Sequence, residues 1–561
     1  VGGADYNGGI TTWILSDPKA SHINIHFNNC KFINCNNRYD GKDGLPREFK
    51  RQGGAFQHGH SESIKRADLS FSFCEFSDNY ISGCGGALAF ELEGNLAIIN
   101  CNFNSNKATL SSNCLSNGGA IFLSETIAKR AQINKEVIIS NCNFVCNEGN
   151  QGSAIYYHSD ASDKTINFII ESSTFQNNGK IGQSQIMSYA PEFTFFNNTM
   201  EYNSTSEIIS GGDFAISLPT AKGINISYCS FSNSQTLAGN GGFLHIQQNA
   251  HDIVYDNSFN LNHLLFDGGQ NYASIQLILA NLYSFSSNNV TISNQIYDDT
   301  FNEIQLTSSD GSIINLQNWI FSNCTNQGSI RLVASQSITF NSCRWENNQR
   351  SGENGGGMNI VSNPDVQPQY TYTRCHFENN TATKHGGGIY ADISSKLTIR
   401  DCSFYYNKAG FKSTASLNLL ADDNYMGGAL YITGSANENQ IENTIFVENS
   451  GDNGHALYIG SEISIMITYD NIFTDNGKDS LVNTSVIYNE SPNLAIGAPI
   501  FNYTGQTHPY NIFNYVDCTT NPEYERRNEV FIDQLFQIPA CVESCKFINC
   551  TFIDVEKPNQ Q

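Results

Sequence analysis

The string LTIRDCSFYYN, which begins at Leu397, decides the fold because it holds two short alternating segments with one break between them. In its first half, Leu397 and Ile399 are apolar residues two positions apart. In its second half, Cys402 and Phe404 repeat that spacing. A period of two is typical of a β-strand. Asp401 breaks the alternation, so we predict that it forms a corner between two short strands.

The second half of this string follows the pattern C-x-F-x-x-N, which recurs along the chain. Equivalent parity breaks occur at Asn100 and Ser342, where we also expect corners. Further copies start at Cys74, Cys101, Cys142 and Cys375, and a copy that starts at Cys343 has Trp345 at the Phe position. Looser copies, in which Ser, Thr, Asn or Trp often replaces Cys, centre on Phe175, Phe231, Phe259, Phe321, Phe446 and Phe473. Near Phe32, Phe321 and Phe547, the Asn position holds Cys35, Cys324 and Cys550.

A second motif, G-G-A followed by an apolar residue, alternates with the first. It starts at Gly53, Gly85, Gly118 and Gly427, with variants at Gly152, Gly241, Gly356, Gly387 and Gly454. Two motifs in strict alternation indicate a repeat protein. The paired glycines provide a positive φ and a close backbone approach where a strand begins.

The spacing of the Phe positions sets the size of one repeat. Phe76 and Phe103 are 27 residues apart, as are Phe377 and Phe404. One such unit cannot bury its own apolar face, whereas parallel stacking of units pairs every backbone group with its neighbours. We therefore predict an all-β fold, a right-handed parallel β-helix (solenoid) of about 15 coils, with about 27 residues per bare coil and loop insertions.

We expect the repeats to occupy residues 1–505. Residues 506–544 break the pattern and are expected to form an irregular cap or clasp, and residues 545–561 a final coil and tail. The motif aromatics should stack in one buried ladder. Its members are Phe32, Phe76, Phe103, Phe144, Phe175, Phe231, Phe321, Trp345, Phe377, Phe404, Phe446, Phe473 and Phe547. The Asn that ends each motif should turn inside a corner and bond to neighbouring coils.

Composition restricts the partners. The chain has 561 residues with 53 acidic and 30 basic side chains, a net charge of −23, so neither nucleic acid nor anionic lipid is an expected partner. Aromatic residues make up 12%, which favours a packed core over disorder. No apolar run is long enough to span a membrane, so we expect no membrane insertion by this chain.

The 17 cysteines fit disulfides in an oxidising compartment better than zinc sites, which would need paired CxxC motifs with His. This favours an extracellular or cell-surface location. We expect most of the C-x-F cysteines to be reduced and to act as small, buried apolar residues. Disulfides should use Cys35, Cys84, Cys114, Cys518 and Cys541 instead.

Ten sequons permit N-glycosylation, although chance predicts about as many in a chain so rich in Asn and Ser. They are Asn197, Asn203, Asn225, Asn289, Asn323, Asn379, Asn483, Asn489, Asn502 and Asn549.

Three long gaps separate the Asn corner from the G-G-A motif, at residues 37–52, 109–117 and 409–426. Because they fall at one place in the repeat, the loops should project from one side. Such loops either carry a binding site or are tolerated surface insertions, and the sequence favours neither.

The alternation of F-x-x-N with G-G-A-[ILV] over roughly residues 25–505 resembles the repeats of the chlamydial polymorphic outer membrane proteins. The resemblance implies a secreted β-helical adhesin or surface-structure protein. Bacterial members end in an outer-membrane β-barrel, and this sequence departs from them because no set of ten-residue alternating strands precedes its last residues. We therefore expect that a translocator has been removed or that secretion takes another route.

A polysaccharide-active enzyme, a lyase or glycoside hydrolase, is the alternative function, because many parallel β-helices act on acidic polysaccharides. Such a site needs clustered carboxylates or Ca²⁺ ligands beside a basic residue. Asp422-Asp423 and His58-Gly59-His60 are the candidates, and we interpret both as solvated loop residues. We predict no catalytic, cofactor-binding or metal site, and an extracellular structural or adhesive protein.

The string C-K-F-I-N-C occurs at residues 30–35 and again at residues 545–550. Chance repetition inside a degenerate motif is one explanation. The other is a head-to-tail homopolymer, because such a contact does not close on itself and builds filaments. Cys30, Cys35, Cys545 and Cys550 could lock that joint. The expected partner is therefore the chain itself, or a host or surface glycan or protein.

Overall fold

The computed structural model describes the chain in segments, and every secondary-structure element in them is a β-strand. The described residues are 10–12, 22–37, 53–58, 67–92, 94–110, 116–125, 135–159, 166–179, 184–190, 192–201, 214–218, 223–235, 242–247, 259–271, 275–279, 284–297, 304–308, 313–325, 330–333, 337–350, 354–361, 368–410, 425–468, 471–477, 486–490, 494–496, 500–502, 511–513, 529–532, 536–539 and 551–552. The chain forms two compact units, Val1–Ala280 (unit 1) and Asn281–Gln561 (unit 2).

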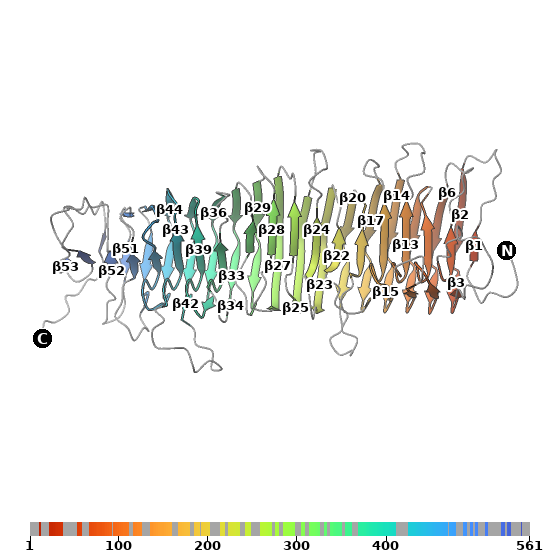
Figure 1. Ribbon diagram of the computed structural model, residues 1–561, viewed down its shortest axis with the longest axis horizontal. Helices are drawn as coiled ribbons and strands as arrows, with labels where there is room; N and C mark the ends of the chain where they lie inside the picture. The colour runs from red at the N-terminus through yellow and green to blue at the C-terminus, as the bar shows by residue number, and fades with distance from the viewer. Residues whose placement is uncertain are drawn as a thin grey trace. The chain divides into compact units, whose positions relative to one another are not determined.

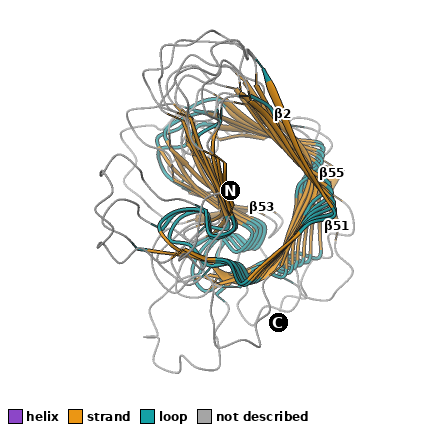
Figure 2. Ribbon diagram, turned by 90° about the vertical axis from the view of Figure 1, so that its right-hand side faces the viewer, coloured by secondary structure: helices purple, strands orange, loops and turns teal. Residues whose placement is uncertain are grey.

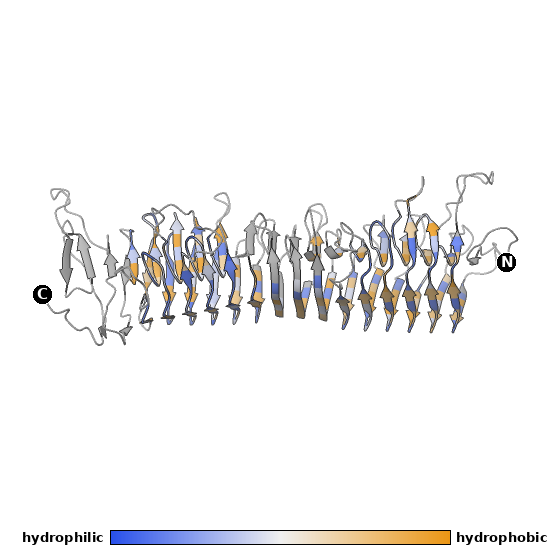
Figure 3. Cartoon of the chain, turned by 90° about the horizontal axis from the view of Figure 1, so that it is seen from below, coloured by the Kyte–Doolittle hydropathy of each residue, from blue (hydrophilic) through white to orange (hydrophobic). Residues whose placement is uncertain are grey.

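Within each unit the chain winds in coils, and each coil contributes three main strands that pair in parallel with their equivalents in adjacent coils (Figures 1 and 2). We call them the glycine strand, which follows the G-G-A motif, the leading strand, which precedes the first corner, and the aromatic strand, which contains the motif Phe. Apolar and polar residues alternate along them (Figure 3), and the burial patterns show every second residue buried.

The strands of unit 1 fall into these three ladders and one short ladder. The glycine strands are β5 (Phe56–His58), β9 (Leu88–Glu91), β13 (Ile121–Glu125), β16 (Ile155–Ser159), β19 (Ile186–Ser188), β22 (Phe214–Leu218), β24 (Gly242–Gln247) and β26 (Ile275–Leu279), and β1 (Ile10–Thr12) pairs with β5. The leading strands are β2 (Ile23–Asn28), β6 (Ala67–Ser72), β10 (Leu96–Ile99), β14 (Lys135–Ser140), β17 (Ile166–Glu171) and β20 (Glu192–Phe196). The aromatic strands are β3 (Lys31–Ile33), β7 (Glu75–Ser77), β11 (Asn102–Asn104), β15 (Asn143–Val145), β18 (Thr174–Gln176) and β21 (Thr199–Glu201). β23 (Gly223–Gln235) and β25 (Phe259–Asn271) run through both positions, and β4 (Asn36–Asn37), β8 (Tyr80–Ser82) and β12 (Lys107–Thr109) form the short ladder.

Unit 2 repeats the arrangement. The glycine strands are β28 (Ile304–Ser308), β31 (Ile330–Val333), β35 (Met358–Val361), β39 (Ile389–Ile393), β43 (Leu430–Gly434), β46 (Leu457–Ile459), β49 (Ile487–Asn489), β52 (Asn511–Phe513) and β54 (Phe536–Pro539). The leading strands are β29 (Ile313–Gln317), β32 (Ser337–Asn341), β36 (Gln369–Thr373), β40 (Leu397–Arg400), β44 (Asn439–Glu442), β47 (Ile465–Ile467) and β50 (Leu494–Ile496). The aromatic strands are β30 (Ile320–Ser322), β33 (Arg344–Glu346), β37 (His376–Glu378), β41 (Ser403–Tyr405), β45 (Ile445–Val447), β48 (Ile472–Thr474), β51 (Ile500–Asn502) and β55 (Thr551–Phe552), and β27 (Ser284–Tyr297) serves both positions. The short strands are β34 (Gln349–Arg350), β38 (Thr381–Ala382) and β42 (Lys408–Ala409).

The final described strands of unit 2 include one reversal. β52 pairs in parallel with β49, and β54 pairs in parallel with β52, so the glycine ladder continues into residues 506–544. β53 (Glu529–Ile532) then pairs antiparallel with β54. The part of residues 506–544 that is described therefore adds strands to the sheet.

Coil length varies around the predicted 27 residues. Paired corner residues are 24 apart between Cys324 and Asn348 and 42 apart between Asn407 and Asn449. The three long insertions lie mostly outside the described residues. Their described flanks support the predicted common position, because each comes between a short strand or its equivalent and a glycine strand.

Where the flanking residues are described, residues in the left-handed conformation bracket the aromatic strands and form the corners. Asn100 has φ 54° and Ser105 has φ 53° on either side of β11. Asp401 and Ser342, with φ 54° and 53°, confirm the other two corners predicted from the parity breaks. Asn, Asp and Ser dominate these positions because their short polar side chains tolerate the left-handed region.

The paired glycines do two different things. Gly118 has φ +68°, which L-residues rarely adopt, and a Cβ on Gly119 would lie 2.0 Å from the Ser153 carbonyl oxygen of the next coil. Two variants of the motif start one residue earlier than the sequence suggests, because the positive φ belongs to Gly355 and Gly386 rather than to the glycines after them.

The motif aromatics form a buried ladder in each unit. Phe76, Phe103 and Phe144 are fully buried, and their ring centroids are 4.8 Å apart from coil to coil with interplanar angles of 3°. Each such ring stabilises the fold by about 1.5–3 kcal/mol through burial. The remaining predicted members are buried as well: Phe32, Phe175, Phe231, Phe321, Trp345, Phe377, Phe404, Phe446 and Phe473.

One sequence assignment of an aromatic motif is wrong, and another falls outside the described residues. Phe259 pairs with Ile224 in a leading position, and Phe266 is the residue that pairs and stacks with Phe231. The F-x-x-N match at Phe259 is therefore accidental. Phe547 lies outside the described residues, and Phe552 pairs with Phe501 in the last aromatic strand. Met200 also takes a Phe position, between Phe175 and Phe231 in register.

The motif Asn residues form a second buried ladder. Asn106 Nδ2 donates hydrogen bonds to the Phe76 carbonyl oxygen (2.9 Å) and to Asn147 Oδ1 (2.9 Å), one on each side. The Asn106 backbone N–H also donates to Asn147 Oδ1 (3.1 Å). Each buried amide is thereby satisfied by both neighbouring coils, which makes burial of this polar group tolerable.

The motif Cys position is a third ladder, and its cysteines are free and buried as predicted but also take part in hydrogen bonds. The backbone N–H of Cys375 donates to Cys402 Sγ (3.3 Å), and that of Cys402 donates to Thr444 Oγ1 (3.4 Å). In unit 1 the Ser173 N–H donates to Asn198 Oδ1 (2.7 Å). In these coils the Cys, Thr and Asn side chains accept a hydrogen bond from the neighbouring coil, which Ser can also do, whereas Leu264 pairs with Cys229 and shows that an apolar side chain is also accommodated.

Candidate functional site

The two residues that flank each motif aromatic point outward. In β11 the burial pattern is exposed, buried, exposed, with Phe103 between Asn102 and Asn104. In-register pairing aligns these residues from coil to coil. We call the residues before the aromatic the first outer row, and those after it the second outer row.

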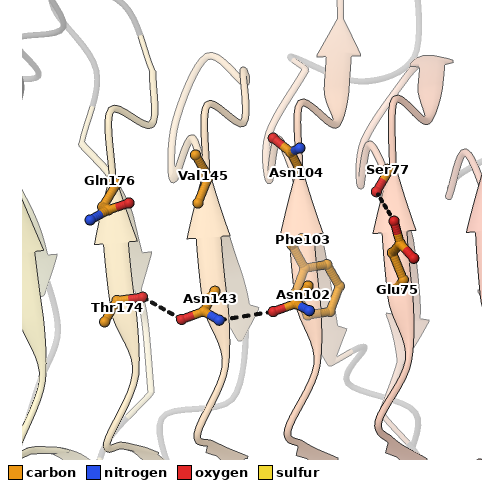
Figure 4. Close-up of a pocket in the computed structure, with 9 residues that line it drawn as sticks. All are labelled: Glu75, Ser77, Asn102, Phe103, Asn104, Asn143, Val145, Thr174 and Gln176. Atoms are coloured by element: carbon orange, nitrogen blue, oxygen red, sulfur yellow. Dashed lines mark hydrogen bonds between the residues drawn. The ribbon is translucent and has the colours of Figure 1, made fainter. Parts of the chain in front are cut away.

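In unit 1 the outer rows line an open pocket over four aromatic strands, β7, β11, β15 and β18 (Figure 4). Its lining comprises Glu75, Ser77, Asn102, Phe103, Asn104, Asn143, Val145, Thr174 and Gln176. The Phe103 ring belongs to the core, and the outward side chains of the lining are amides, hydroxyls, one carboxylate and the apolar Val145.

A chain of hydrogen bonds orders the first outer row. Thr174 Oγ1 donates to Asn143 Oδ1 (2.6 Å), and Asn143 Nδ2 donates to Asn102 Oδ1 (2.8 Å), as the dashed lines in Figure 4 show. Asn102 and Asn143 are exposed. Their remaining donor and acceptor groups face solvent in fixed positions, one per coil, which suits recognition of a repeating hydroxyl-rich or amide-rich polymer.

An ion pair borders this surface. Lys31 Nζ lies 2.8 Å from Glu75 Oε2. The hydrogen bond from Lys31, followed by that from Ser77, lowers the pKa of Glu75, and the same contact with Glu75 raises the pKa of Lys31. Both groups are therefore charged at neutral pH. The pair is exposed, so it fixes side-chain orientation more than it stabilises the fold.

In unit 2 the outer rows carry a cluster of ionisable groups on β33 and β37. Glu346 and Glu378 are paired in register, and Arg344 is paired with His376. His376 Nε2 lies 3.0 Å from Glu378 Oε2, and Arg344 Nη2 lies 2.6 Å from Glu346 Oε1. Ligand atoms of Glu346, His376 and Glu378 all lie within 4.8 Å of one another.

Neither surface is predicted from the sequence motifs, because the motifs describe the inward residues. The signal lies in the neighbours of the aromatic residue once the motifs are aligned. The strings R-W-E at residues 344–346 and H-F-E at residues 376–378 then place two carboxylates and a histidine on adjacent strands. The N-F-N and N-F-V strings at 102–104 and 143–145 similarly align two asparagines.

The described cysteines are mostly thiols. Eleven are free, and no two described cysteines are bonded to each other. The C-x-F cysteines are free and buried as predicted, namely Cys74, Cys101, Cys142, Cys343, Cys375 and Cys402. Burial raises the pKa of Cys74 to about 11 and that of Cys229 to about 12, so these thiols stay protonated.

The predicted disulfide positions have mixed outcomes. Cys84 is disulfide-bonded. Cys35 is a free, half-buried thiol, as is Cys30, so the prediction for Cys35 is wrong. It lies at the Asn position of its motif and its backbone N–H donates to Asn79 Oδ1 (3.0 Å), which places it in the Asn ladder. Cys114, Cys518, Cys541, Cys545 and Cys550 lie outside the described residues.

The sequons occupy different environments. Asn197, Asn289, Asn323 and Asn379 stand at left-handed corners and Asn225 is exposed in β23. Asn489 is fully buried in β49, so it is not an accessible acceptor in the folded chain. Only the backbone of Asn502 is described, and Asn203, Asn483 and Asn549 lie outside the described residues.

Of the loop candidates for catalysis, only His58 is among the described residues, so the structure does not show the candidates together. His58 ends β5, while Gly59, His60, Asp422 and Asp423 lie outside the described residues. No helix in the described part of the chain is long and apolar enough to cross a membrane.

Comparison with known proteins supports the fold. A family model for the right-handed β-helix region matches residues 273–424 and 369–507. With the parallel ladders of both units, this match defines the class: the chain folds as a right-handed parallel β-helix. A search of curated proteins finds no match to it.

Proposed function

We propose that the chain is an extracellular structural or adhesive surface protein that binds through the outer face of its aromatic strands. The observation that carries the proposal is the ordered polar row of Asn102, Asn143 and Thr174. Hydrogen bonding fixes these groups before binding, so little side-chain entropy is lost when a polymer docks. The row repeats with the coil, which matches a ligand that itself repeats.

Two further observations favour this function. The motif alternation resembles the repeats of the chlamydial polymorphic outer membrane proteins, which are surface proteins. Cys84 is disulfide-bonded, and disulfides persist in oxidising compartments outside the cell. The free thiols of the Cys ladder are compatible with that location because burial protects them.

The test is a binding assay of the purified full chain on neutral polysaccharides and on glycosylated cell surfaces. The variant Asn102→Ala, Asn143→Ala, Thr174→Ala removes the row. We expect at least tenfold weaker binding from the loss of three hydrogen-bonding groups. The matched control changes another outward polar row, Thr371→Ala, Thr398→Ala, Gln440→Ala on the leading strands, and should bind as the native chain does.

Equal binding by both variants would place the adhesive surface elsewhere. Release of new reducing ends or unsaturated sugars by the native chain would contradict the proposal and favour the alternative, a polysaccharide-active enzyme.

Self-assembly into head-to-tail filaments is a second proposal, based on the shared C-K-F-I-N-C string. Cys30 and Cys35 support it as free and partly exposed thiols. In the described part of the chain, β3 pairs with β7 along one of its two edges. Sedimentation of the native chain and of the Cys30→Ser, Cys35→Ser variant under oxidising conditions tests it. Polymers that the variant cannot lock support the proposal, and a native chain that stays monomeric at high concentration contradicts it.

A further inference from the structure

Two glutamates on β33 and β37 place two negative charges side by side on the outer surface. Parallel pairing places Glu346 directly opposite Glu378, and like charges at paired strand positions destabilise a sheet. The half-exposed guanidinium of Arg344 lies beside Glu346, and His376 lies beside Glu378.

The histidine is oriented as a metal ligand would be. His376 Nδ1 hydrogen-bonds to Ser403 Oγ (2.7 Å) on the next coil, while Nε2 points to the carboxylates. Metal-binding histidines almost always engage their second nitrogen in this way, which fixes the ring and its tautomer.

One carboxylate oxygen is positioned inside the cluster and lacks a regular hydrogen bond. Glu346 Oε1 is buried and accepts no hydrogen bond of acceptable geometry, although Arg344 Nη2 lies 2.6 Å away. Arg344 is half exposed, so its side chain can move into solvent and leave this oxygen to another cation.

The backbone beneath the cluster is rigid. Trp345 and Phe377, the inward residues between the candidate ligands, are fully buried and stack with ring centroids 4.4 Å apart and an interplanar angle of 2°. Ligands held on packed strands keep their spacing without a cation, which lowers the entropy lost on binding.

We propose that Glu346, His376 and Glu378 bind a divalent transition-metal ion of the Zn²⁺ class. Imidazole with carboxylates suits Zn²⁺, whereas Ca²⁺ and Mg²⁺ prefer all-oxygen ligand sets. Three protein ligands leave a coordination position toward solvent, where a water molecule or a group of a partner completes the shell. This inference does not depend on the proposed adhesive function.

The experiment measures Zn²⁺ affinity of the full chain by calorimetry, with all variants checked for native circular dichroism. His376→Gln and Glu378→Gln each remove one ligand from the outer surface without touching the core. We expect each to lose one equivalent of Zn²⁺ binding or to weaken it at least tenfold. The native chain should bind that equivalent.

Two controls match the variants. His26→Gln removes a histidine of β2. Its Nδ1, like that of His376, hydrogen-bonds to a serine of the next coil, Ser70 Oγ (2.5 Å). Glu75→Gln removes a carboxylate of the first outer row. Both should bind Zn²⁺ as the native chain does.

Because the chain has 17 cysteines, the ligand type is tested separately with Co²⁺. The proposal predicts weak visible bands for the site lost in His376→Gln and no thiolate charge-transfer band. If His376→Gln and Glu378→Gln bind Zn²⁺ as tightly as the native chain, or if the tight site shows the thiolate band, the proposal is wrong.

Discussion

At the scale of single residues, buried polar groups depend on the coils beside them. His455 stands where most coils carry the second glycine of the G-G-A motif, and it is fully buried. Its ring lies against Gly477, where a Cβ would meet it at 2.2 Å. Gly451 N–H donates to His455 Nδ1 (3.3 Å). The local sequence therefore makes room for one neutral imidazole.

Burial makes His455 sensitive to acid. Desolvation lowers its pKa from 6.5 to about 4. The neutral form is favoured in the folded chain, so this contribution to stability is complete above pH 6.5 and is lost as pH falls toward 4. The loss amounts to roughly 3 kcal/mol. Urea unfolding from pH 7 to 4.5 should show a steeper decline for the native chain than for His455→Gly, and parallel declines would contradict this.

The Asn ladder should be intolerant of truncation. Asn380 donates to the Trp345 carbonyl oxygen (2.8 Å) and to Asn407 Oδ1 (2.9 Å). Asn380→Ala removes the donor to the Trp345 carbonyl oxygen and the acceptor for the Asn348 backbone N–H inside the core, so we expect a loss of about 1–3 kcal/mol in unfolding free energy. The adjacent corner variant Asn379→Gly, at an exposed site with φ 52°, keeps a residue that tolerates the left-handed conformation and should change stability by less than about 0.5 kcal/mol. Equal losses in the two variants would rule out a special role for the ladder.

At the scale of strands, each aromatic strand is held from inside by one ring. Phe377 stacks on Trp345 at 4.4 Å and on Phe404 at 4.7 Å, and it is fully buried. Phe377→Ala should lower the unfolding free energy by about 3–5 kcal/mol. The control Phe73→Ala changes an aromatic residue that is 62% exposed and left-handed, with φ 54°. Thermal denaturation should show little change for Phe73→Ala. A loss of stability as large as that of Phe377→Ala would contradict the role of the buried aromatic ladder.

The Cys ladder gives a sharper prediction about chemistry. Cys402 Sγ accepts a hydrogen bond from the Cys375 N–H, and it is buried. Cys402→Ser retains an acceptor and should be tolerated, whereas Cys402→Val leaves that N–H unpaired and should cost about 1–3 kcal/mol. Chemical denaturation of the two variants distinguishes the roles. If the valine variant is as stable as the serine variant, the position requires only a small apolar side chain and no hydrogen-bond acceptor.

At the scale of the whole molecule, the two alternating motifs determine most of the fold because each encodes a geometric need. The Phe fills the core, the Asn bridges coils, and the first glycine allows a positive φ. These needs made the corners at Asn100 and Asp401 predictable. Where other residues meet the same need, as Met200 does for Phe, the pattern is lost from the sequence although the coil remains.

The candidate surfaces could not be predicted in the same way. The outward residues have no packing requirement, so they vary freely from coil to coil. Glu346 and Glu378 are 32 residues apart, and only the register of β33 and β37 brings them together. Similarly, the pairing of Phe552 with Phe501 depends on a register that the motif does not reveal.

The central claim is that equivalent residues of successive coils stack in register, since both outer surfaces follow from it. A double-mutant cycle with Phe103→Leu and Phe144→Leu, in urea unfolding, tests it most directly. Their rings are 4.8 Å apart, so we predict a coupling energy of about 0.5–1.5 kcal/mol. Phe103 and Phe175, separated by the ring of Phe144, should be additive within about 0.3–0.5 kcal/mol. Additivity in both pairs, or stronger coupling in the second, would contradict the stacking.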